Sequence, residues 1–220
     1  MKHLMKSTLM LGLFIFALAC GKKETVDPTV GFSAQIKNIV PQSIIDDLKS
    51  RGMPINEGTI PPKVEGIYKS SPHTLEVPYG TDDSYKKGYE FLDLAMKFSS
   101  QKDDGSLVIE TKTGGVLANG VGGFLSGNGN KFSIFAELKY VDGSVTATQI
   151  RVFSGEITPT GIKDFYTTIF IKEKVDPNGT LFPVGKSRIL KDGDGMASTT
   201  SSFRIVASEG LPISSSDCSK

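Results

Sequence analysis

Hydrophobic and polar positions alternate with a period of two along most of the chain beyond residue 60. The segment KFSIFAELKY, residues 131–140, shows this best, because its apolar positions recur at every second residue. Similar segments are separated by short turn sequences such as QKDDGS, VDGS and DPNGT, which predicts about nine or ten strands. The predicted strands are VEGIYK, HTLEVPY, GYEFLDLAMKF, SLVIETK, KFSIFAELKY, SVTATQIRVFSGEI, GIKDFYTTIFIKEK, GKSRILKD and STTSSFRIVAS.

Short connections without intervening helices favour antiparallel pairing, because parallel strands need long crossovers. Several of the predicted strands are long, and a long open sheet would leave unpaired edges that a closed barrel removes. The pattern therefore predicts a mainly β protein, an antiparallel β-barrel of about 8–10 strands formed by residues 39–210. A two-sheet β-sandwich is the alternative.

One helix is expected before the strands, over residues 41–51. Its apolar residues Ile44, Ile45 and Leu48 share a face at helical spacing. Gly52 stands where a left-handed C-terminal residue belongs, and a proline two residues later prevents continuation.

Two segments leave their structure open to more than one interpretation. GYEFLDLAMKF fits a strand with Leu92, Leu94, Met96 and Phe98 on one face, although a helix is a rival. Residues 114–130 contain many glycines but lack the lysine and hydroxyl residue of a phosphate-binding loop. We expect two strands that meet there at a glycine-rich turn, with bulges and tight bends where the sheet curves.

The N-terminal region has the pattern of an export signal. Lys2 and Lys6 precede a short uncharged apolar run. The run ends with the small residues Ala17 and Ala19, and Cys20 follows directly. This junction resembles the lipobox of bacterial lipoproteins. The resemblance implies a signal peptide at 1–19, lipid attachment to Cys20, and a lipidated tether at 20–38 that holds the domain on a membrane. Gly21, in place of Asp, favours the outer membrane.

Composition limits the partners. Without the two signal-peptide lysines, 25 − 2 = 23 basic residues face 24 acidic ones, a formal net charge of −1. No basic excess points to nucleic acid. If Cys20 carries lipid, Cys218 has no partner within the chain for a disulfide, and it falls in a flexible tail predicted for 211–220.

The sequence offers little for catalysis. His73 is the one histidine outside the predicted signal peptide, and SSPHTL predicts a turn that would leave it exposed. Asp192 and Asp194 in DGDG lack the further ligands of a calcium loop, so a turn is expected. We expect no enzyme activity, no cofactor and no metal.

Four segments, MPINEGTIPPKVEGIY, GFLSGNGNKFSIFAE, GIKDFYTTIFIKEK and PVGKSRILKDGDGMA, together resemble a family of Gram-negative lipoproteins without an established activity. The resemblance covers most of residues 35–205. The segment from Glu65 to Tyr68 is also similar to the G-x-W that opens lipocalin barrels, with Tyr in place of Trp.

Two functions are expected for such a protein. The first is binding of a small apolar ligand in the barrel. The second is a structural or interaction subunit with a protein partner in the envelope. The aromatic candidates for the ligand site are Phe132, Phe135, Phe153, Phe165, Tyr166 and Phe170.

Overall fold

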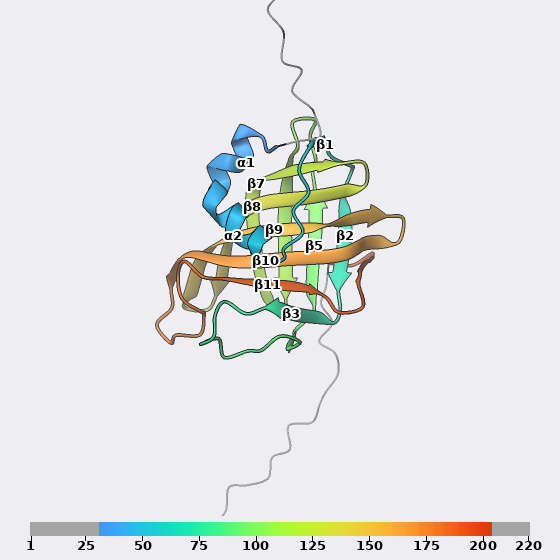
Figure 1. Cartoon of the computed structure of the whole chain (residues 1–220). Coiled ribbons are helices and arrows are strands. Elements are labelled where there is room, and N and C mark those ends of the chain that lie inside the picture. Colours follow the sequence, from blue (N-terminus) through green and yellow to red (C-terminus); the bar gives the residue numbers. More distant parts are fainter. Residues whose placement is uncertain (1–30, 204–220) are drawn as a thin grey trace, which may run out of the picture.

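The computed structural model describes residues 31–203, with the side chain of Val121 left out. Two short helices precede a series of strands that belong to one sheet (Figure 1). The helices are α1 (Ala34–Ile39) and α2 (Gln42–Ser50). The strands are β1 (Thr59–Ile60), β2 (Gly66–Ser70), β3 (His73–Val77), β4 (Glu90–Phe91), β5 (Leu94–Ser99), β6 (Ser106–Thr113), β7 (Val116–Asn128), β8 (Lys131–Asp142), β9 (Val145–Thr158), β10 (Gly161–Val175), β11 (Ser187–Asp192) and β12 (Met196–Thr199).

Eight of the strands form a closed ring of backbone hydrogen bonds. The order is β12-β2-β5-β6-β7-β8-β9-β10, and β10 pairs again with β12 to complete the circuit. Every neighbouring pair within the ring is antiparallel, as the short connections predict. The sheet is mixed only through β1, which lies parallel to β7, and β11, β3 and β4 extend it beyond β10.

The inside of the ring holds one hydrophobic core to which all eight ring strands contribute. The largest side chains in it, Phe98, Phe132, Phe153 and Phe165, are fully buried. The predicted inward face of β8 is confirmed, since Phe132, Ile134, Ala136 and Leu138 are buried here and Tyr140 packs against them.

A second core lies on the outside of the ring, under the helices. Ile36 of α1 and Ile45 and Leu48 of α2 pack with Phe135 of β8 and Ile150 of β9. Strand β8 therefore has apolar burial on both faces, which its alternating pattern alone did not predict. Figure 1 shows the helices along β7, β8 and β9.

Helix α2 confirms the predicted helix, with Pro41 as the N-cap and Gly52 at a φ of +87° after the last turn. Helix α1 was not predicted and falls in the segment assigned to the tether. The Ser33 hydroxyl accepts a hydrogen bond from the Ile36 amide at 3.3 Å and so caps its first turn.

Two expectations for the strands were wrong. Leu92 does not join Leu94 and Met96 in the core: it lies in a bend between β4 and β5 and is 66% exposed. The glycine-rich stretch is not two strands meeting at a turn, because residues 116–128 form the single strand β7. Register shifts on both sides of β7 agree with the bulges and bends that were expected in this stretch.

Several predictions concern residues outside the described range. These are the signal peptide at 1–19, lipid attachment at Cys20, most of the tether, Cys218 and the tail at 211–220. Within residues 31–203, neither helix is long and apolar enough to span a bilayer.

Candidate functional site

A cavity of about 370 Å³ opens at the end of the ring that carries the β6–β7 and β8–β9 turns. Its walls come from five successive ring strands, β6 to β10, and from β4, β11 and the loops beside them. The wall residues include Thr111, Ala118, Tyr140, Gln149, Arg151, Ile169, Ile171 and Arg188. Aromatic and aliphatic groups, Tyr85, Phe91, Leu92, Leu181 and Phe182, complete the lining. The volume is at the small end of the range of about 300–1,000 Å³ for ligand pockets.

Arg151 is the unusual residue of this cavity. It lies on β9 on the same face as Phe153, directly opposite Ala136 of β8, so the strand register directs it into the ring. It is only 5% exposed. Burial lowers the pKa of its guanidinium to about 10, which leaves the group charged at neutral pH.

The charge of Arg151 has little compensation. Its Nη1 donates a long hydrogen bond of 3.4 Å to the Gln149 side chain, and its guanidinium lies 5.4 Å from the centre of the Phe153 ring. Its Nε has no hydrogen-bond partner, and no carboxylate within residues 31–203 forms an ion pair with it. A buried ion without a partner costs several kcal/mol, so native proteins seldom keep one without a use.

Arg188 of β11 lines the same cavity, but its charge is balanced by a carboxylate. Its Nε and Nη2 donate to the two carboxylate oxygens of Asp83 at 2.9 and 2.6 Å. Aromatic rings surround the guanidinium, with the closest centre, that of Phe182, at 4.6 Å. The other rings within 6 Å are those of Tyr79, Tyr85 and Phe91.

Two carboxylates shape the loops that form the mouth of the cavity. Asp83 accepts hydrogen bonds from the Tyr79 and Tyr85 amides, which closes the loop that carries Tyr85. Burial opposes the charge of Asp83, but Arg188 and these amides keep the carboxyl pKa below its ordinary value.

Asp176 holds the loop after β10 by accepting hydrogen bonds from its backbone amides. It accepts hydrogen bonds from the Thr180 and Leu181 amides at 2.9 and 2.8 Å and pairs with Lys174 at 2.9 Å. Burial opposes the charge, yet these partners hold the carboxyl pKa of Asp176 far below its ordinary value. This loop places Leu181 and Phe182 in the cavity wall.

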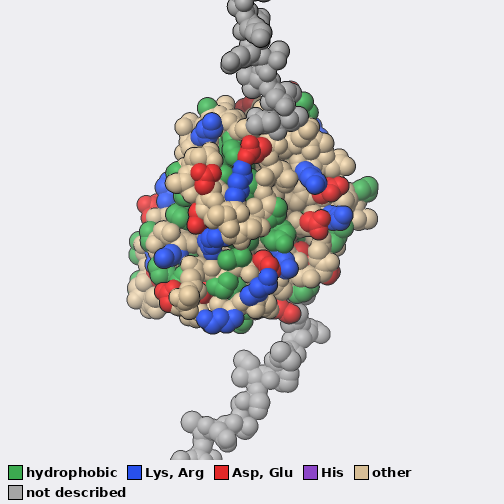
Figure 2. Space-filling view, viewed as in Figure 1, with side chains coloured by type: hydrophobic (Ala, Val, Ile, Leu, Met, Phe, Trp, Pro, Cys, Tyr) green, Lys and Arg blue, Asp and Glu red, His purple; other side chains and the backbone are tan. Residues whose placement is uncertain are grey.

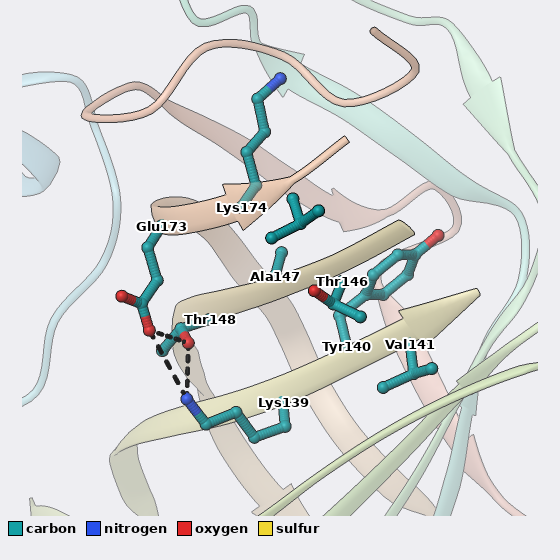
Figure 3. Close-up of a pocket in the computed structure, with 9 residues that line it drawn as sticks. Lys139, Tyr140, Val141, Thr146, Ala147, Thr148, Glu173 and Lys174 are labelled. Atoms are coloured by element: carbon teal, nitrogen blue, oxygen red, sulfur yellow. Dashed lines mark hydrogen bonds and ion pairs between the residues drawn. The ribbon is translucent and has the colours of Figure 1, made fainter. Parts of the chain in front are cut away.

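A second hollow, of about 280 Å³, lies across the ends of β8, β9 and β10 (Figure 3). In it Lys139, Thr148 and Glu173 point toward one another, and Thr148 is hydrogen-bonded to both charged groups at 2.6 Å. The side chains of Lys139 and Glu173 are more than 60% exposed and form an ion pair with each other. This hollow therefore lacks the unpaired buried group that distinguishes the cavity at the ring end.

The prediction for His73 was wrong. The turn before it exists, but His73 is only 3% exposed, and its Nδ1 lies 3.1 Å from the Ser70 hydroxyl. Burial, assisted by the charge of Arg151 and partly opposed by Asp93, lowers the imidazole pKa to about 3.

Asp192 helps to hold the turn just before His73, together with the turn at 192–195 that the sequence predicted. It accepts hydrogen bonds from the amides of Ser71, Asp194 and Met196. Within residues 31–203 no cluster of acidic, histidine and cysteine residues has the arrangement of a metal site.

The six aromatic residues proposed from the sequence do not line the cavity. Phe132, Phe153 and Phe165 fill the interior core, and Phe135, Tyr166 and Phe170 belong to the outer core. The cavity instead takes its aromatic rings from Tyr85, Phe91, Tyr140 and Phe182. Arg151 was missed, although its place two residues before Phe153 on a long alternating strand is a signal that could have found it.

No protein-family model, no curated protein and no solved structure matches this chain.

Proposed function

We propose that this protein is a lipid-anchored lipoprotein of the bacterial outer membrane that binds a small ligand at the end of a lipocalin-like β-barrel. The observation that carries the binding role is the cavity of about 370 Å³ at the ring end, which is lined by the buried Arg151, a cation without an ion-pair partner among residues 31–203. The closed circuit of eight antiparallel strands around a shared core supports the barrel description.

The envelope location rests on the N-terminal sequence. The apolar run before Cys20 and the Gly that follows it support lipid attachment and export to the outer membrane. Charges of both signs are mixed over the face shown in Figure 2, which agrees with a protein that does not bind nucleic acid.

Native mass spectrometry of the full-length chain, purified gently from its own host, tests the binding role. We expect a reproducible extra mass that is lost on denaturation. A bare mass in preparations that retain the folded protein would oppose the binding role and favour a subunit that acts through protein contacts in the envelope. Labelling with radioactive palmitate tests the anchor, since Cys20→Ser should abolish incorporation.

A further inference from the structure

We propose that the ligand is a small amphipathic carboxylate, whose single negative charge is held by Arg151 at the floor of the cavity. This inference rests on the proposed binding role and adds the chemical class of the ligand. The observation behind this inference is that Arg151 is a buried cation without an ion-pair partner among the described residues. The other arginine in the cavity wall, Arg188, is paired with a carboxylate.

The charge balance of the cavity selects one negative charge. Arg188 is neutralised by Asp83 through two hydrogen bonds, which leaves Arg151 as the uncompensated cation among the described lining residues. Asp142 is the one carboxylate among the lining residues that the structure describes, and it is exposed and accepts a hydrogen bond from the Tyr140 hydroxyl at 3.4 Å. A dianionic phosphate monoester would bring more charge than Arg151 alone offers to balance.

The free donors also fit a carboxylate. A guanidinium presents its N–H groups in a planar fork that matches two carboxylate oxygens. Nη1 of Arg151 donates to the Gln149 side chain, whereas the buried Nε has no hydrogen-bond partner among residues 31–203. The Gln149 amide group carries two further N–H donors beside it.

The other walls fit a short apolar tail. Ile169 lies between Arg151 and Arg188 across three strands, with Ile171 two residues further along β10. Leu92, Phe91, Leu181 and Phe182 continue the apolar lining toward the mouth. The exposed Leu92 thereby forms part of the apolar wall, and the cavity volume restricts the ligand to a short chain.

The test compares octanoate with 1-octanol, a neutral molecule of the same chain length. Binding to the full-length chain in lipid nanodiscs is measured by calorimetry, with empty nanodiscs as the blank. We expect octanoate to bind more tightly than octanol. Arg151→Met should weaken octanoate binding by about 10- to 100-fold, as for a hydrogen bond to a charged group, and leave octanol binding unchanged.

Two further variants sharpen the comparison. Arg151→Lys should recover part of the octanoate affinity because it keeps the charge but loses the fork. Lys139→Met removes one positive charge from the neighbouring hollow and should leave octanoate affinity unaltered. The Nε–H signal of Arg151 in the wild-type protein should move when octanoate is added, a readout that requires no variant to fold.

The outcomes separate the two proposals. If octanol binds as well as octanoate, and Arg151→Met changes neither, the cavity holds a neutral ligand: this inference fails and the binding role stands. If neither molecule binds and the host-purified protein carries no extra mass, both fail. Octyl phosphate binding at least 10-fold more tightly than octanoate would overturn the carboxylate in favour of a phosphate.

Discussion

The buried His73 predicts that the protein loses stability in mild acid. Its imidazole is 3% exposed, and burial and Arg151 lower its pKa from an ordinary value of about 6.5 to about 3. Between these two pH values the unfolded chain binds a proton at this position and the folded chain does not. The free energy of unfolding therefore falls as the pH falls through this window.

The size of the effect follows from the window. One pH unit corresponds to about 1.4 kcal/mol, and pH 5 lies about 1.5 units below the unfolded pKa. His73 should accordingly cost about 2 kcal/mol of stability between pH 7 and pH 5. Most carboxylates with lowered pKa values, such as Asp83 and Asp176, lose their contribution only at lower pH.

The assay is urea unfolding of the full-length chain followed by circular dichroism at pH 7 and pH 5. His73→Asn keeps a polar group near Ser70 and removes the titration. The variant is expected to be less stable than the wild type at pH 7, and the quantity that matters is the loss between the two pH values. This loss should shrink by about 2 kcal/mol in the variant. An equal loss in both proteins would refute the assignment, whatever their absolute stabilities.

Three matched pairs test other parts of the structure by the same unfolding measurement. Leu94→Ala should lower the free energy of unfolding by about 2–5 kcal/mol because Leu94 is buried in the ring, whereas Leu92→Ala should lower it by less than about 0.5 kcal/mol. Similar losses in the two variants would contradict the bend between β4 and β5. Asp83→Asn should lower the free energy of unfolding by about 3–5 kcal/mol because it leaves Arg188 without its carboxylate. Asp82 is exposed, so Asp82→Asn is a control that should be nearly neutral, and an equal loss in both variants would argue against the ion pair. Gly120→Ala should be strongly destabilising because the added Cβ would overlap the Glu137 carbonyl oxygen, whereas the Cβ of Gly115→Ala would enter open space and should be tolerated. A tolerated Gly120→Ala would refute the close approach of β7 to β8.

The strands could be predicted because period-two alternation is a local property. The inward residues of β8 and the turn before Val145 follow from the residues themselves. The burial of Phe135 could not be predicted this way. It is outward-facing by alternation, and only the packing of α1 and α2 over the ring buries it. Helix α1 was missed for a related reason, because a six-residue helix with one buried side chain, Ile36, leaves almost no periodic signal.

The errors at Leu92 and in the glycine-rich stretch have a common physical cause. Each depends on where a strand bends, and a bend is set by contacts with neighbouring strands. Gly127 stands at a φ of +153°, and a Cβ there would lie 2.9 Å from the Cα of Phe132. The glycine therefore reflects a close approach of strand β8, which the sequence around Gly127 does not specify.

Arg151 marks the place where local reasoning and fold disagree most, and the disagreement itself supports a functional role. Alternation on β9 makes its position an interior one, and an interior position favours an apolar residue such as its neighbour Phe153. A well-packed apolar side chain in place of a buried ion is often neutral or stabilising, so stability alone gives no reason to keep an arginine there. Arg188 faces the same cavity but has Asp83, and the ion pair explains its presence as part of the loop structure. For Arg151 the described chain supplies no such partner, and a negatively charged ligand is the compensation that the cavity has room to accept.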